Sequence, residues 1–323
     1  MIQKLLRSMM AKSHFGKRLD RALVELFPDY SRSCIKEWIL NDRVQINGNV
    51  INKPKEKVLG NETIMIDALI DEELRWEAED NKLDIIYEDQ DILVINKPFN
   101  LVVHPGVGNP NGTLLNRLLH YFPTVAGVPR AGIVHRLDKD TTGLMVIAKT
   151  LLAQARLMKL LQARAITREY EAVVVGSMIT SGTINEPICR HPIKRTYMSV
   201  HPMGKPAVTH YRITDHFRSY THLRLRLETG RMHQIRVHMM HVNHPLLGDQ
   251  LYGGRLCLPK GASEELVTAL RAFDRQALHA TMLRLYHPIS GIEMEWHASL
   301  PKDMADLVKI LKADKESFKD KHN

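Results

Sequence analysis

The sequence has few cysteines and no long apolar run, and these two absences limit the classes of protein to which it can belong. Its 323 residues include three cysteines, Cys34, Cys189 and Cys257, which show no paired spacing. An odd count without a disulfide framework suits a reducing compartment, so we expect a cytoplasmic protein. No apolar run approaches the roughly 20 residues that cross a bilayer. The apolar stretch within residues 1–12 is too short and too interrupted for a signal peptide.

Positive charge is the first property that the chain does have. Lysine and arginine outnumber aspartate and glutamate by 45 to 36, which gives a net charge of +9 at pH 7. This excess indicates a polyanionic partner, although charge alone does not separate nucleic acid from an anionic membrane surface. Hydrophobic residues make up 44% and charged residues 25%, as in globular proteins. The length allows a large core and predicts two domains.

A small basic module is predicted near the N-terminus, over residues 16–75. Apolar residues at helical spacing predict one helix over 17–27 and a second that begins after Ser31, its expected N-cap. A hairpin is predicted over 44–51, because Asn47 and Gly48 suit the positive φ angles of a tight turn. Two short helices followed by a hairpin resemble an S4 RNA-binding domain. Residues 1–15 are expected to lack fixed structure.

A larger mixed domain is predicted over residues 89–312, after a linker at 76–88. Its strands outnumber its helices and occur in runs, not in strict alternation with helices. This order favours an α+β fold with a mixed, mostly antiparallel sheet over a doubly wound parallel sheet. Residues 313–323 are expected to form a fraying charged tail. The predicted strands lie at 91–95, 144–148, 172–175, 209–214, 221–228, 280–285 and 292–296, and the predicted helices at 113–121 and 150–163.

One run of the larger domain, Gly132 to Leu144, combines charge with turn-forming residues. It places Asp138 beside Arg136 and Lys139, before a Thr-Thr-Gly turn and an apolar strand. A carboxylate in this setting can stay ionised beside a cation and still face a ligand. An aspartate before a turn is nevertheless more often a turn or capping residue than a nucleophile. The run alone therefore does not establish a catalytic role.

Two further motifs give this run a context. Arg-Glu-Tyr occupies 168–170 before an apolar run, and Gly-Arg-Met-His-Gln-Ile-Arg at 230–236 joins an alternating strand to a predicted helix. Together with His-Arg-Leu-Asp at 135–138, these motifs resemble those of the A family of ribosomal large-subunit pseudouridine synthases, in the same order. The resemblance extends from about Gly16 to about Lys309. It implies a bent mixed sheet with the active-site cleft across its middle. Met232 departs from the family, which often has threonine or another small residue there.

The reaction that the resemblance implies breaks the bond between uracil and ribose, turns the base and rejoins it through carbon. It involves no net redox change, so no metal or organic cofactor is expected. Asp138 is implied as nucleophile or base, and Tyr170 as a phenol that packs against the target base and relays a proton. Arg231, on the turn before the predicted helix, is expected to pair with Asp138. Without the motifs, a buried strand position would be the commoner role for Tyr170, and a surface or phosphate contact for Arg231.

Two more motif residues are expected to hold the substrate. The target uridine lies in structured RNA and has to leave its stack before it reacts. The resemblance supports Arg136 as the residue whose planar guanidinium fills the vacated space. Ile235, one helical turn after Arg231, is expected to offer an apolar wall to the uracil, although core packing would explain it equally well. His135 is expected to be structural.

Five cations of the N-terminal module form the predicted RNA-binding surface. They lie on or near one face of its two helices and would contact phosphates without reading bases. Basic residues on exposed helices are commonly ordinary solvated surface. Their spacing alone therefore favours neither RNA binding nor a purely solvated surface. The resemblance favours RNA. The five residues are Arg18, Arg21, Arg32, Lys36 and Arg43.

The resemblance implies 23S ribosomal RNA as the substrate, at the loop of helix 69, and a monomer is expected. Two alternative functions remain open. A tRNA-modifying member of the same family would have the same catalytic residues. A non-catalytic RNA-binding factor for ribosome assembly would fit the charge, but it would not need Asp138, Tyr170 and Arg231 together.

A histidine cluster offers a third alternative, a zinc site. His238, His241 and His244 recur at intervals of three residues, and a helix would bring the first two to one face. No His-Glu-x-x-His motif accompanies them, and Pro245 is expected to end the helix there. Because the chain has 17 histidines, such spacing arises easily, and we expect no metal site.

Overall fold

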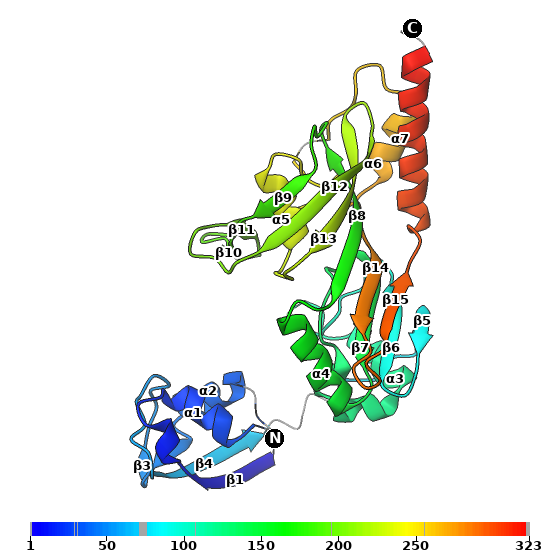
Figure 1. Ribbon diagram of the computed structural model, residues 1–323. Coiled ribbons are helices and arrows are strands. Elements are labelled where there is room, and N and C mark those ends of the chain that lie inside the picture. The colour runs from blue at the N-terminus through cyan, green and yellow to red at the C-terminus, as the bar shows by residue number, and fades with distance from the viewer. Residues whose placement is uncertain are drawn as a thin grey trace. The chain divides into compact units, whose positions relative to one another are not determined.

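The computed structural model describes residues 2–28, 30, 32–70, 76–106, 108–194, 196–254 and 256–320. The chain divides into two compact units, Met1–Arg75 and Trp76–Asn323 (Figure 1). Ser31, the expected N-cap of the second helix, lies outside the described residues. So do residues 71–75, just before the expected linker, and the last three residues of the expected tail.

The first unit packs two helices against a four-stranded antiparallel sheet. The helices are α1 (Leu19–Leu26) and α2 (Arg32–Leu40), and a 3-10 helix, η1 (Lys12–His14), precedes them. The strands follow the order β1 (Ile2–Met9), β4 (Thr63–Ile70), β2 (Val44–Ile46), β3 (Asn49–Val50). Apolar residues at helical spacing in the helices and alternating ones in β4 meet in one core. Its fully buried members include Leu19, Leu23, Ile35, Ile39, Ile64 and Ile66.

The predicted hairpin is present as β2 and β3. Ile46 pairs with Asn49, so Asn47 and Gly48 form a two-residue loop. Their φ angles are 51° and 85°, values that asparagine and glycine adopt more readily than other residues. The Asn47 side chain also accepts a hydrogen bond from the Thr63 N–H at 2.8 Å, which ties the loop to β4.

The prediction that residues 1–15 lack fixed structure was wrong. Residues 2–9 form the edge strand β1, which pairs antiparallel with β4 along its whole length. Leu5 and Met9 remain exposed on this strand, whereas Met10, which follows it, is fully buried. The pairing partner lies far away in the sequence, and the strand buries little of its own apolar surface. No local apolar pattern therefore marks it.

A nine-stranded sheet forms the centre of the second unit (Figure 1). Eight strands follow the order β5-β6-β7-β14-β8-β13-β12-β9, and β15 pairs with β14. The bounds are β5 (Ile85–Glu88), β6 (Ile92–Lys97), β7 (Thr142–Ala148), β8 (Thr167–Val175), β9 (Gly182–Asn185), β12 (Val208–His216), β13 (Tyr220–Leu227), β14 (Leu278–Tyr286) and β15 (Glu293–His297). A separate antiparallel pair is formed by β10 (Ile188–Arg190) and β11 (Met198–Val200).

This sheet confirms the predicted α+β class. Among the strand pairs described, only β7 and β14 run parallel, and the other neighbours are antiparallel. The parallel pair brings Gly143 of β7 against Ala280 of β14, where a Cβ on Gly143 would lie 2.3 Å from the Ala280 carbonyl oxygen. Glycine is therefore required where the strand that follows the Asp138 turn enters the sheet.

Three helices of the second unit begin with a side-chain cap. Thr113 and Asn116 form a capping box at the start of α3. The hydroxyls of Thr150 and Ser263 accept backbone N–H bonds in the first turns of α4 and α6. The helices are α3 (Leu114–Tyr121), α4 (Leu151–Gln162), α5 (Gln234–His241), α6 (Glu264–Ala272), α7 (Lys302–Asp320) and the 3-10 helices η2 (Pro123–Gly127) and η3 (Pro129–Gly132). Within the described ranges, none of these helices combines the length and the apolar character that crossing a membrane requires.

Two segments that were expected to lie outside the large domain belong to it. Within the expected linker, residues 85–88 form β5, Leu83 packs on the main core, and the Glu79 side chain accepts a hydrogen bond from the Gly112 N–H at 2.6 Å. The expected tail continues α7, which runs beside α6 (Figure 1). Asp314 of this helix is buried and lies 3.1 Å from Nη1 of Arg218. A buried ion pair fixes the helix here, so the high charge of the segment does not make it a tail.

Candidate active site

A cavity of about 610 Å³ opens in the second unit where the three sequence motifs meet. Its wall comes from the turn before β7, the start of β8, the end of β13 and the turn that leads into α5. The volume lies within the ~300–1,000 Å³ that is typical of ligand sites. Six arginines and two carboxylates line it, so the wall is strongly basic. They are Arg130, Arg136, Arg164, Arg168, Arg231 and Arg236, with Asp138 and Glu228.

The turn that carries Asp138 is fixed by neighbouring elements. The Thr141 N–H donates to the Asp138 carbonyl at 3.1 Å and closes the turn. The fully buried ammonium of Lys97, at the end of β6, donates to the Lys139 carbonyl at 2.9 Å and to two further backbone carbonyls. Burial lowers the pKa of Lys97 to about 7, against the opposing effect of the Asp140 and Asp138 charges. Because one ammonium satisfies three carbonyls, the turn is held rigidly.

The Asp138 carboxylate forms an ion pair with Arg236 of α5. Nη1 of Arg236 lies 3.2 Å from Oδ2 of Asp138. Arg236 is buried, and Asp249 accepts hydrogen bonds from its Nε at 2.7 Å and its Nη2 at 2.8 Å. Burial would lower the pKa of Arg236, but the bonds and charge of Asp249 and the charge of Asp138 raise it. A permanent cation therefore orients the partly exposed Asp138 carboxylate, and Asp249 orients the cation.

The expected pairing of Arg231 with Asp138 was wrong. Arg231 lines the cavity, but its Nε donates to the Pro206 carbonyl at 3.1 Å, and its N–H donates to the Gln234 side chain at 3.0 Å. Because α5 begins at Gln234, Arg231 lies on the preceding turn, and Arg236 projects from the first helical turn. The motif contains both arginines, and no local signal distinguishes them. Asp249 lies outside the motif, and nothing in its neighbourhood marks it as a partner.

His233 and Tyr252 complete the surroundings of Asp138. Nε2 of His233 lies 3.9 Å from Oδ1 of Asp138, and its Nδ1 lies 2.9 Å from the Tyr252 hydroxyl. Burial lowers the pKa of His233 despite the nearby charge of Asp138, so the ring is neutral at pH 7. His233 has a φ of 56°, in the left-handed region. Strained residues of this kind cluster at functional sites.

Three other expected site residues reach the cavity wall. Tyr170 on β8 is buried, and burial raises the pKa of its phenol, which therefore stays protonated. Ile235 of α5 lines the cavity and also belongs to the main core, so the wall position and core packing are compatible. Arg136 is exposed, and its side chain forms no hydrogen bond or ion pair with the part of the chain that the structure describes. Its guanidinium is available to stack on a base.

His135 joins the Asp138 motif to the sheet. Its Nε2 accepts a hydrogen bond from the Val146 N–H of β7 at 3.0 Å. Burial and the nearby charge of Arg168 lower the pKa of His135 to about 3. A nitrogen that accepts a hydrogen bond is unprotonated, so both observations describe a neutral histidine in a structural contact.

Two of the three histidines at 238, 241 and 244 use their ring nitrogens in structural contacts. Both ring nitrogens of His238 are in hydrogen bonds, at 2.8 Å to the Thr209 hydroxyl and 2.9 Å to a backbone carbonyl. Nδ1 of His244 lies 2.9 Å from another backbone carbonyl. α5 ends at His241, before His244. These nitrogens serve the packing of α5 and of the chain that follows it.

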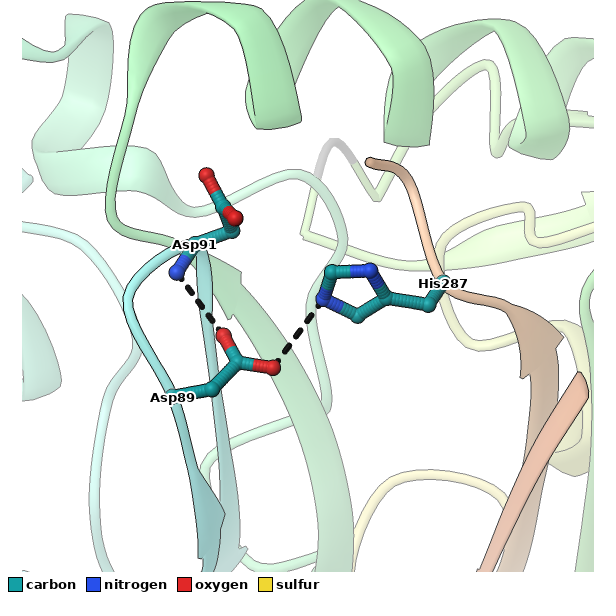
Figure 2. Close-up of side chains that lie close together, drawn as sticks. All are labelled: Asp89, Asp91 and His287. Carbon is teal, nitrogen blue, oxygen red and sulfur yellow. Dashed lines mark hydrogen bonds and ion pairs between the residues drawn. The ribbon is translucent and has the colours of Figure 1, made fainter. Parts of the chain in front are cut away.

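Among the described residues, one group has the spacing of metal ligands: Asp89, Asp91 and His287 (Figure 2). Oδ1 of Asp89 accepts the N–H of Asp91 at 2.8 Å, and Oδ2 lies 3.0 Å from Nε2 of His287. Nδ1 of His287 accepts a hydrogen bond from the Ser290 N–H at 3.0 Å. Because Nδ1 accepts, Nε2 carries the proton that faces Asp89 and offers no lone pair to a metal. The group is a structural carboxylate–histidine pair.

The five cations predicted to bind RNA differ in their availability. Three of them form ion pairs with carboxylates of the first unit and therefore also stabilise its fold. Two are exposed and form no hydrogen bond or ion pair within the described ranges. The paired residues are Arg18 and Arg32, which both bind the buried Asp20, and Arg43, which binds Asp67. The exposed residues are Arg21 and Lys36.

Two family models match the chain. Residues 91–241 match RNA pseudouridylate synthase, and residues 17–64 match the S4 domain. The first range contains the motifs that form the cavity wall, and the second contains both helices and the hairpin of the first unit.

Curated relatives match nearly the whole length. The ribosomal large subunit pseudouridine synthase D of Salmonella typhimurium is 70% identical over 315 residues, which cover 98% of this chain and 97% of the relative. The protein of the same name from Yersinia pestis is 69% identical over 318 residues, 98% of each chain. The Escherichia coli K12 protein is 67% identical over 315 residues, with 98% and 97% covered.

A solved structure supports the same assignment. Human RNA Pseudouridylate Synthase Domain Containing 4 matches with a TM-score of 0.56 and 26% identity, covering 71% of this chain and 93% of that one. Sequence, domain content and fold agree. The chain therefore belongs to the RNA pseudouridylate synthases, in the group of the ribosomal large subunit synthase D proteins.

Proposed function

We propose that this protein isomerises uridines of 23S ribosomal RNA to pseudouridine, with the loop of helix 69 as its target. The observation that carries the proposal is the Asp138 carboxylate, which a buried Arg236 orients at the wall of a basic cavity. The names of relatives at 67–70% identity support ribosomal RNA over tRNA as the substrate. A non-catalytic binding factor would not require this oriented carboxylate.

The reaction breaks the bond between uracil N1 and ribose C1′ and forms a bond between C5 and C1′. The C5 proton is lost and N1 gains a proton, so atoms and electrons balance without a redox partner. Asp138 acts on the ribose or the base as nucleophile or general base. Its ion pair with Arg236 keeps it charged and limits its rotation. The protonated phenol of Tyr170 packs against the uracil and can donate or relay a proton.

The remaining cavity residues hold the flipped nucleotide. The apolar side chain of Ile235 bounds the space for the uracil, and the unpaired guanidinium of Arg136 is free to occupy the stack that the base leaves. Arg231 lies at the cavity wall in a position to contact the RNA and not Asp138. We assign catalysis to the unit that begins at Trp76 and RNA affinity to the first unit. We further propose a monomer that acts in the cytoplasm.

Pseudouridine mapping of 23S rRNA tests the proposal directly. RNA from cells that lack the protein is treated with carbodiimide and examined by primer extension, beside RNA from cells complemented with the wild type. We expect the helix 69 signals to disappear without the protein and to return with it. Unchanged rRNA combined with a missing tRNA signal would instead establish a tRNA-modifying enzyme.

A separate prediction concerns the affinity of the first unit for rRNA. Replacing Arg21 and Lys36 together with alanine should weaken binding to rRNA and lower the slope of log affinity against log salt by about 0.7 to 0.9 for each phosphate that is no longer neutralised. Glu37→Ala, on the same exposed stretch of α2, is the matched control and should leave the slope unchanged. Filter binding at several salt concentrations measures both. Equal slopes for the double variant and the wild type would show that these cations are solvated surface.

A further inference from the structure

Arg168 is an arginine in the cavity wall that has no hydrogen-bond or ion-pair partner among the residues that the structure describes. It lies on β8 two residues before Tyr170, and both residues line the cavity. Its Nε is buried and has no hydrogen-bond acceptor. No carboxylate of the described residues lies within ion-pair distance of it. A buried donor without an acceptor is rare in folded proteins, and a bound water, ion or ligand is one explanation for it.

The other cavity arginines do not share this combination. Arg236 binds two carboxylates, Arg164 pairs with Glu228 at 2.9 Å, and Arg231 binds a backbone carbonyl. Arg130 and Arg136 are exposed and solvated. Among the arginines that the structure describes in this wall, Arg168 is the one that is half-buried with a donor that is shielded from solvent and unpaired. Burial lowers the pKa of His135, and the charge of Arg168 lowers it further. The Arg168 charge therefore acts on groups inside the site.

Gly230 makes room for this guanidinium. A Cβ on Gly230 would lie 2.8 Å from Nη1 of Arg168. The backbone of Gly230 is not in the left-handed region that favours glycine, so its conformation does not require this residue type. The glycine of the Gly-Arg-Met-His-Gln motif is therefore explained by the room that the Arg168 guanidinium needs. Since the atom that it accommodates is the end of a flexible side chain, a methyl group there would displace Arg168 and leave the backbone in place.

We propose that Arg168, in the space left by Gly230, binds a phosphodiester that flanks the flipped target uridine. This inference rests on the proposed function. A flipped nucleotide brings its flanking phosphates to the mouth of the pocket. Each of these phosphates carries its full negative charge before the reaction begins. Guanidinium groups bind phosphate oxygens through paired N–H donors. The alternative ligand is an oxygen of the uracil, which gains charge only as the glycosidic bond breaks.

Steady-state kinetics of Arg168→Gln separates these ligands. A phosphate is equally charged in the ground state and in the transition state, so its loss should raise KM about 10- to 100-fold and leave kcat within about twofold. Arg168→Lys should recover part of the loss. The control is Arg284→Gln, which removes the same charge from an exposed site on β14 outside the cavity lining and should leave KM unchanged. A fall in kcat with unchanged KM would overturn the proposal in favour of a uracil contact.

Two further variants test the position of the contact. Gly230→Ala should raise KM in the same direction, and the double variant Arg168→Gln/Gly230→Ala should be no worse than Arg168→Gln alone. A hairpin from the modified region of 23S rRNA can carry a neutral methylphosphonate on the 5′ or the 3′ side of the target uridine. One of these two should raise the wild-type KM and leave that of Arg168→Gln unchanged. Additive effects of substitution and methylphosphonate at both sides would refute the contact. An inactive wild type would instead refute the proposed function.

Discussion

Replacing Asp138 with asparagine should abolish isomerisation while RNA binding persists. The substitution keeps the size of the side chain and one oxygen that can still accept from Arg236, which remains bound to Asp249. It removes the charge that a nucleophile or base needs. We expect a loss of about 10³-fold or more in the single-turnover rate. The C5 hydrogen leaves during the reaction, so release of tritium from [5-³H]uridine in the RNA measures the rate.

The neighbouring Asp140 provides a matched control for this prediction. Asp140→Asn removes the same charge two residues further along the same turn, and Asp140 does not line the cavity. Its backbone carbonyl, which accepts from Arg275 at 3.2 Å, is retained in the variant. We expect a far smaller loss of rate for Asp140→Asn, because the Asp140 charge supports the Lys97 ammonium but the side chain does not line the cavity. If Asp138→Asn released tritium as fast as Asp140→Asn, Asp138 would not be the catalytic residue.

Local patterns in the sequence were sufficient for most elements of the fold. Thr150 caps a helix that was predicted to begin there, and Asn47-Gly48 forms the predicted hairpin loop with the positive φ angles of a tight turn. The preponderance of strands in runs predicted an antiparallel α+β sheet, because parallel strands require intervening crossovers. Each of these inferences depends on residues close together in the chain.

The failures concern contacts between distant residues. Strand β1 is specified by its pairing with β4. Helix α7 continues into the expected tail because Asp314 forms an ion pair with Arg218. Neither contact leaves a local signal. In the site, Asp138 and Tyr170 come from two of the motifs and line one cavity, but the third motif could not say which of its two arginines reaches the carboxylate. That choice depends on where α5 begins and on Asp249, which the chain brings back to the buried side of Arg236.

Arg236→Gln should damage stability and catalysis together. The arginine is 5% exposed and lies between two carboxylates, one of which, Asp249, has a fully buried side chain. Its removal leaves that buried charge with two backbone N–H donors, from Leu251 and Tyr252, as its other contacts. Loss of one partner from a buried ion pair costs about 3–5 kcal/mol. We expect a loss of this size in the free energy of unfolding, measured by urea denaturation.

The effect of Arg236→Gln on rate has to be separated from unfolding. Measured at a temperature where the variant is folded, kcat should fall about 10²- to 10³-fold, because the Asp138 carboxylate loses the charge that orients it. Arg231→Gln is the discriminating control, since Arg231 binds the Pro206 carbonyl and makes no contact with Asp138. It should leave kcat and stability nearly unchanged and alter at most the affinity for RNA. If instead Arg231→Gln lost kcat and Arg236→Gln kept it, the carboxylate would be oriented by the first arginine of the motif in the complex with RNA. The ion pair in the free protein would then not be the catalytic arrangement.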